Sequence, residues 1–174
     1  MKKQLQYLVL ALCISVSSSI FAQAPSSQVS QLDSTGKKTG LWIEDYKPIR
    51  VFAYYKNGLR EGICQVIQQS TGDLYSIGEF KEGIKTGTWY HFNNNFLLSK
   101  VYNIESNSQY KRVDGGTIIF PTHTATVIKY HPNGVIRSEG RILFNEDYEA
   151  ESDDYGIWKY YDEQGVLINT IEFK

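Results

Sequence analysis

The chain has 174 residues, of which 18 are basic and 19 acidic, and its net charge at neutral pH is -1. This length leaves room for one domain and a short appendage. The near-neutral charge excludes the strongly basic balance of most nucleic-acid-binding domains, so no nucleic-acid partner is expected. After residue 24 the chain has 22 Phe, Tyr or Trp residues against only three alanines, which favours a sheet protein over a helical bundle.

Residues 1–24 have the pattern of a secretory signal. Two lysines precede an apolar run of about nine residues, Leu8 to Val16, and small residues follow up to Ala24. The run is too short for a membrane span, which takes about 20 apolar residues, and no later stretch comes close. We therefore expect a mature chain without a transmembrane segment, exported to the periplasm or the medium, with 16 basic and 19 acidic residues and a net charge of -3.

The cysteines argue against a lipid anchor and against a disulfide. Cys13 follows Leu12 inside the apolar run rather than a small residue, so a lipoprotein is not expected. Cleavage leaves Cys64 as the only cysteine of the mature chain, which excludes an intramolecular disulfide. We interpret Cys64 as a buried, small apolar residue. Residues 25–35, rich in Ser and Gln, are predicted to be a flexible leader.

A seven-residue pattern recurs after the leader. The form G-x-x-x-G-x-(W/C) starts at Gly36, Gly58 and Gly83, with spacings of 22 and 25 residues, and a degenerate copy runs from Ser152 to Trp158. A near-constant period indicates a repeat architecture. We expect the paired glycines to allow tight connections and a close approach of neighbouring units.

Each copy is followed by a turn and by a second run of β-forming residues. Gly or Asn in these turns tolerates positive φ, and Asn is predicted to replace glycine in the turn at 93–95. The predicted return strands are 74–80, 135–144 and 166–173. Each unit is therefore predicted to be a β-hairpin.

A single hairpin is marginal in water, so adjacent hairpins must stack and bury their aromatic rings against each other. We predict an all-β domain over residues 36–174, made of stacked antiparallel β-hairpins in an elongated twisted sheet. Residues 104–123 break the period and are predicted to be a long loop or an irregular unit. Residues 145–155 form a second insertion, and insertions in repeat arrays often mark the binding face.

The segment Tyr130 to Phe144, followed by Gly156 to Leu167, resembles the bacterial variant of the MORN repeat. The resemblance extends over roughly residues 36–174, and the family also includes proteins labelled YwqK-type antitoxins. It implies stacked antiparallel hairpins in an elongated, twisted sheet and a binding or scaffolding role. It implies no substrate.

The second insertion is strongly acidic. Its acidic residues are Glu146, Asp147, Glu149, Glu151, Asp153 and Asp154. A calcium loop needs a glycine at its sharp turn, and the insertion has none, so calcium is a weaker interpretation than a solvated loop. Recognition of a basic partner is the other interpretation that stays open.

The chain shows no motif for a metal or for catalysis. His91, His123 and His131 are 32 and 8 residues apart, which matches no zinc spacing. The chain has no G-x-S-x-G elbow, although a triad assembled from distant units stays open. We predict no cofactor, no metal and no catalytic residue.

Aromatic residues recur in register with the repeat and are either the core or a ladder of binding platforms. Their presence in every unit, with few other large apolar residues, favours the core. In the tyrosine doublets 54–55 and 160–161 one ring is expected on each face of the sheet, and the outward rings are the better ligand candidates. The candidate partner-binding residues are Trp42, Tyr46, Tyr54, Tyr55, Trp89, Phe92, Glu146, Asp147, Glu149, Glu151, Trp158, Tyr160 and Tyr161.

Three hypotheses for the function follow. The first is a secreted or periplasmic, non-enzymatic module that binds a protein or another cell-envelope component, or acts as a scaffold. The second, suggested by the family label and the acidic insertion, is an antitoxin or immunity-type inhibitor of a toxin. The third is an envelope hydrolase. We favour the first, because the chain combines a repeat and an export signal with no catalytic motif.

Overall fold

A computed structural model describes residues 29–94, 96–107, 112–114, 117–119, 121–145 and 152–174. These residues form strands and turns but no helix, and hence no helix that could cross a membrane. The strands are β1 (Gln31–Leu32), β2 (Lys38–Tyr46), β3 (Ile49–Lys56), β4 (Leu59–Gln68), β5 (Leu74–Lys81), β6 (Ile84–Asn93), β7 (Phe96–Ser106), β8 (Arg112–Asp114), β9 (Thr117–Ile119), β10 (His123–Tyr130), β11 (Ile136–Phe144), β12 (Asp153–Tyr161) and β13 (Leu167–Phe173).

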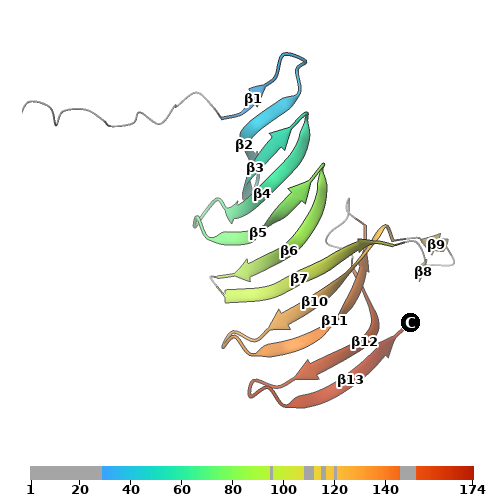
Figure 1. Cartoon of the computed structure of the whole chain (residues 1–174). Coiled ribbons are helices and arrows are strands. Elements are labelled where there is room, and N and C mark those ends of the chain that lie inside the picture. The colour runs from blue at the N-terminus through green and yellow to red at the C-terminus, as the bar shows by residue number, and fades with distance from the viewer. Residues whose placement is uncertain (1–28, 95, 108–111, 115–116, 120, 146–151) are drawn as a thin grey trace, which may run out of the picture.

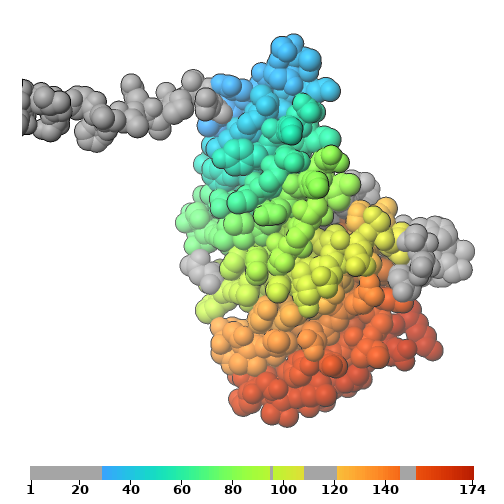
Figure 2. Space-filling model, in the orientation of Figure 1, coloured from blue at the N-terminus to red at the C-terminus, as the bar shows by residue number. Residues whose placement is uncertain are grey.

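Eleven of the strands form one antiparallel sheet in chain order, from β1 at one edge to β13 at the other (Figure 1). The exceptions are β8 and β9, which form a separate two-stranded ribbon between β7 and β10. The space-filling view shows the same order as successive bands of colour along an elongated molecule (Figure 2). The predicted all-β fold of stacked antiparallel hairpins is confirmed.

Tight turns with positive φ join several of the consecutive strands. Asn57 and Gly58, between β3 and β4, have φ values of 54° and 84°. Positive φ at both central residues is the requirement of the type I′ hairpin turn, which explains why the first glycine of the repeat recurs. Asn94, between β6 and β7, has φ 47°, so the prediction that Asn replaces glycine there is confirmed.

The cross-strand register aligns the tryptophans in one row. Residues directly opposite each other on paired strands share a face of the sheet. We call the face that carries Trp42, Trp89 and Trp158 the indole face and the opposite one the outer face. One row on the indole face crosses ten strands and consists of Trp42, Ala53, Cys64, Gly78, Trp89, Val101, Val127, Gly140, Trp158 and Ile171.

Two glycines of this row are required by the indoles. A Cβ added at Gly78 would lie 2.2 Å from Cδ2 of Trp89, and one at Gly140 would lie 2.3 Å from Cδ2 of Trp158. The rings therefore lie flat on the backbone of the neighbouring strand. The sequence predicted this close approach for the paired glycines of the repeat, but a Cβ at Gly36 or Gly62 would meet nothing within 4 Å. Those glycines are needed for their positive φ instead.

The core lies almost entirely on the indole face. It consists of two clusters, one around Trp89 and one around Trp158, and both pack against Val101 and Ile104. Trp158 is fully buried and Trp89 is 3% exposed. A single-layer sheet buries rings to this extent only when it curves toward them, and bulges in most strand pairs supply that bend.

The first interruption of the repeat and the predicted leader both contain strands. The irregular unit predicted at 104–123 contains the β8–β9 ribbon. The predicted leader, residues 25–35, is described from Val29 onward, and its Gln31 and Leu32 form β1 along the edge of β2. Trp42 fixes this segment by donating its Nε1 proton to the carbonyl of Gln31 at 3.1 Å.

Candidate functional site

A second row of cross-strand neighbours lies on the indole face, and its members on the central strands are polar. It consists of Glu44, Val51, Val66, Ser76, His91, Ser99, Lys129, Ser138, Tyr160 and Asn169. Ser76 and Ser138 are buried, whereas His91, Ser99 and Lys129 between them are half-buried. The register thus gathers three groups of chemical interest from β6, β7 and β10, which the sequence separates by up to 38 residues.

At the β2 end of this row a buried carboxylate organises a charged network. Glu44 forms an ion pair with Lys38, accepts a hydrogen bond from Tyr55 at 3.0 Å, and lies 3.4 Å from a guanidinium nitrogen of Arg60. Burial alone would raise the pKa of Glu44, but the hydrogen bonds from Lys38 and Tyr55 outweigh it and hold that pKa below its usual value. Every charge here has a partner, so we assign this end of the face a structural role.

A lysine covers each of the three indoles. The Nζ atoms of Lys38 and Lys85 lie 4.5 and 4.2 Å from the ring centroids of Trp42 and Trp89, which follow them by four residues. The same position before Trp158 holds an acidic residue, and Lys129 from β10 supplies the cation instead, at 4.8 Å. Such cation–π contacts are worth about 0.5–1 kcal/mol when exposed and more when desolvated.

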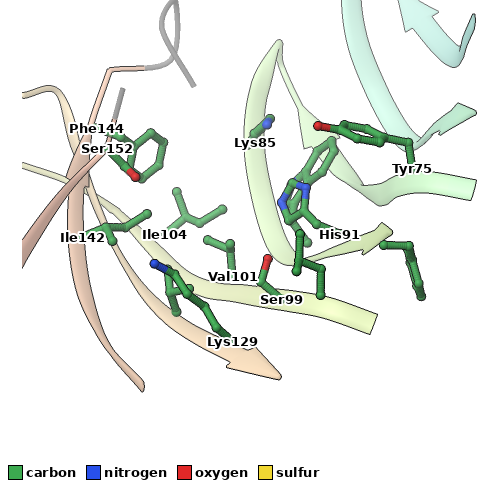
Figure 3. Close-up of a pocket in the computed structure, with 14 residues that line it drawn as sticks. Tyr75, Lys85, His91, Ser99, Val101, Ile104, Lys129, Ile142, Phe144 and Ser152 are labelled. Carbon is green, nitrogen blue, oxygen red and sulfur yellow. The ribbon is translucent and has the colours of Figure 1, made fainter. Parts of the chain in front are cut away.

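A hollow of about 260 Å³ opens on the indole face between the two core clusters. Its apolar wall includes Trp89, Val101, Ile104, Val127, Ile142 and Phe144. Its polar groups include Lys85, His91, Ser99 and Lys129, which Figure 3 shows around one opening. Among the described residues that line the hollow there is no carboxylate, and Lys85 and Lys129 are its charged members.

The hollow has a clear origin in the repeat. Counting strands in pairs, β10 occupies the position of an indole-bearing strand, but it carries Val127 in the indole row. The adjacent return strand carries Val101, whereas three of the other return strands have alanine or glycine at this place and β13 has Ile171. Two valines therefore replace an indole and a small residue, and the face is left open at this unit.

One buried donor in the wall of the hollow is unsatisfied. Nε1 of Trp158 donates to the carbonyl of Arg141 at 2.9 Å, and Nε1 of Trp42 also donates to backbone carbonyls. Within the described part of the chain, Nε1 of Trp89 is the one buried side-chain nitrogen or oxygen without a hydrogen-bond partner. Leaving such a group unpaired costs about 1–3 kcal/mol, so an acceptor near it would be favourable.

The structure separates the predicted aromatic candidates by accessibility. Trp89 and Trp158 are core residues, and a partner could not reach them without displacing their neighbours. Tyr46 and Tyr54 are each 52% exposed. The half-buried candidates are Trp42, Tyr55, Phe92, Tyr160 and Tyr161.

Of these half-buried rings, Phe92 lines the hollow. Tyr160 stacks on Trp158, with centroids 6.3 Å apart. Tyr161 donates its hydroxyl to Glu139 of the outer face at 2.7 Å. The tyrosine doublets therefore divide between the two faces as predicted.

The acidic candidates Glu146, Asp147, Glu149 and Glu151 lie outside the described residues. Ser152, which follows them in the sequence, lines the hollow, and Asp153 and Asp154 begin β12.

Sequence reasoning did not single out Lys85, Ser99 or Lys129, and it considered His91 only as a zinc ligand. One signal was available for Lys85, since a lysine stands four residues before two of the tryptophans. The hollow itself was signalled by the unit that breaks the period.

In the described part of the chain no group of three or more His, Cys, Asp or Glu side chains could hold a metal. His123 stacks on Phe144, and His131 bonds to the carbonyl of Tyr161.

Comparison with known proteins adds no family to this description. No protein-family model matches the chain, and no curated protein sequence matches it significantly.

Proposed function

We propose that this protein is an exported, non-enzymatic binding module of MORN-like hairpin repeats, and that it binds a protein of the cell envelope through the hollow on its indole face. The export signal and the resemblance of the repeat come from the sequence. The observation that carries the proposal is the hollow, an apolar opening with convergent polar groups at a unit where Val127 stands in the indole row.

The size of the hollow favours an anchor residue of a protein over a whole small molecule. Small-molecule and cofactor sites usually measure about 300–1,000 Å³. The hollow, at about 260 Å³, is smaller and open to one side. Interfaces are dominated by a few large side chains that insert into such openings.

The test is capture of partners from an envelope extract by immobilised residues 25–174. In the variant Ser99→Phe an aromatic ring fills the hollow from β7, and we expect it to lose a specific partner that the natural chain retains. The control is Tyr54→Ser, which changes an exposed ring of the outer face and should leave capture unchanged. Circular dichroism of both variants checks the fold. Equal capture by Ser99→Phe and the natural chain would refute the proposal.

A second candidate, an envelope hydrolase, is favoured by one observation. Ser99 lies directly between His91 and Lys129 in the cross-strand register, and either neighbour is a base that can activate a serine. The test is turnover of p-nitrophenyl acetate and of peptide substrates. Turnover that Ser99→Ala abolishes would support a hydrolase, and turnover that this variant retains would exclude Ser99 as its nucleophile.

A further inference from the structure

We infer that the edge strand β13 pairs in antiparallel fashion with β13 of a second copy of the chain, so that two sheets join into one symmetric dimer. β13 contributes no residue to the described lining of the hollow, and the inference does not rest on the proposed function.

The two edges of the large sheet differ in how they are protected. β1 is only two residues long, which leaves little edge to pair with another chain. β13 is seven residues long and, among the described strands, pairs with β12 alone (Figure 1). It carries neither lysine nor proline, and its one bulge lies near its start, at Tyr160 and Tyr161 of β12. A long edge with so little protection is a template for another strand.

The side chains of β13 are those of an interior strand, but they are not covered. The return strands β3, β5 and β11 each bury at least two residues, whereas six of the seven residues of β13 are exposed. Leu167, Ile168 and Ile171 expose 52%, 65% and 39% of their surface. A neighbouring strand would remove part of this apolar surface from water, as it does for the strands inside the sheet.

The backbone of β13 shows directly that a hydrogen-bond partner is missing at the edge. The N–H of Thr170, in the middle of the strand, donates to the side-chain oxygen of Asn169 at 2.8 Å. In an antiparallel sheet, alternate residues direct their N–H and C=O groups to opposite neighbours. The Asn169 side chain therefore supplies the acceptor that a further strand would supply, and Thr170 is the natural centre of a new pairing.

A second copy of β13 fits this edge. A two-fold axis through Thr170 sets the whole strand against itself in the antiparallel sense used throughout the sheet, and it lets each Thr170 N–H donate to the other Thr170 carbonyl. Each Asn169 then lies opposite Ile171 of the other copy. Ile168 lies opposite Glu172, so no like charges face each other, and the two Thr170 side chains form a favourable cross-strand pair.

The experiment is sedimentation equilibrium of residues 25–174 at concentrations from about 1 µM to about 300 µM. One strand pair is a small interface, so we expect a reversible monomer–dimer equilibrium with a dissociation constant in the micromolar range.

Proline at position 170 separates pairing from folding. Thr170→Pro should abolish the dimer, because it removes the N–H that bonds across the axis. The monomer should keep its circular dichroism spectrum, since an edge strand tolerates proline where the missing N–H faces solvent. Thr170→Val is the matched control, because it keeps the N–H, and it should still dimerise.

A charge exchange tests whether the two Thr170 residues meet. Thr170→Lys and Thr170→Glu should each weaken dimerisation about fivefold, since like charges then face each other. An equimolar mixture of the two variants should restore the dimer, which a variant that merely unfolds could not do.

Three results would overturn the inference: a natural chain that stays monomeric over the whole range, a folded Thr170→Pro that still dimerises, or a mixture that associates no better than its components. If the natural chain is monomeric but Thr170→Pro loses a captured envelope protein, the edge binds a strand of that protein and self-pairing is refuted.

Discussion

The contact between Gly140 and Trp158 allows a sharp test of how the units hold together. Ordinary contact of a Cβ begins at about 3.4 Å, but a Cβ at Gly140 would lie 2.3 to 2.5 Å from Cδ2, Cε2 and Cγ of the indole. In Gly140→Ala the ring must therefore move by roughly 1 Å, and it is fully buried against Tyr160 and Phe173.

Two effects of Gly140→Ala lower the free energy of unfolding, and one effect partly compensates for them. Overpacking costs about 1–3 kcal/mol. Displacement of the ring also breaks its hydrogen bond to the carbonyl of Arg141, and a buried donor without a partner costs about 1–3 kcal/mol. Alanine in place of glycine returns about 0.5–1 kcal/mol of chain entropy. We expect Gly140→Ala to lower the free energy of unfolding by about 2–4 kcal/mol.

The assay is urea unfolding followed by circular dichroism, with Gly78→Ala as the matched variant. A Cβ at Gly78 would meet Trp89 equally closely, at 2.2 Å, but Nε1 of Trp89 has no hydrogen bond to lose. Gly78→Ala should therefore cost less than Gly140→Ala. In a Trp158→Leu background the cost of Gly140→Ala should nearly vanish, because the clash is gone. A cost of Gly140→Ala below about 0.5 kcal/mol, the level of a surface substitution, would refute the reasoning.

Three further predictions concern the β2 end of the indole face. Because the pKa of Glu44 is lowered in the folded state, its carboxylate stabilises the fold above the unfolded pKa of about 4.3, and this contribution is lost as the pH falls through the folded pKa. Urea unfolding should thus show Glu44→Gln less stable than the natural chain at pH 7, with a difference that shrinks below about pH 4; a constant difference would contradict this. Tyr55→Phe should lower the free energy of unfolding by about 1–3 kcal/mol, because the hydroxyl bonds charged groups, whereas Tyr54→Ser should be neutral, and equal effects would contradict the assignment of faces. Cys64, 2% exposed, should react with a thiol reagent only at the rate of unfolding, and rapid labelling of the native chain would show that β4 is open.

The sequence predicted the architecture well because its signals are local. Gly58 and Asn94 specify turns by their own backbone conformation, and a recurring Trp marks one strand in three of the units. The interactions that hold the units together are less visible. Gly78 and Gly140 lie outside the repeated glycine pattern, and their role depends on which strand an indole covers.

The candidate site was hidden for the same reason. Lys129 covers Trp158 across two strand boundaries, 29 residues away in the sequence, and only the cross-strand register reveals this contact. Val127 is an ordinary strand residue until the register places it where three other units have an indole. Properties that depend on several registers at once cannot be derived from the pattern of a single unit.

The most direct test of the account is lysine footprinting of residues 25–174, alone and bound to the captured envelope partner, by acetylation and mass spectrometry. The account predicts that Lys85 and Lys129 become protected on binding, since both line the hollow. Lys159, which shares the outer face with Glu139, should stay as reactive as in the free protein. Protection of Lys159 with unchanged reactivity of Lys85 and Lys129 would place the partner on the outer face and contradict the account.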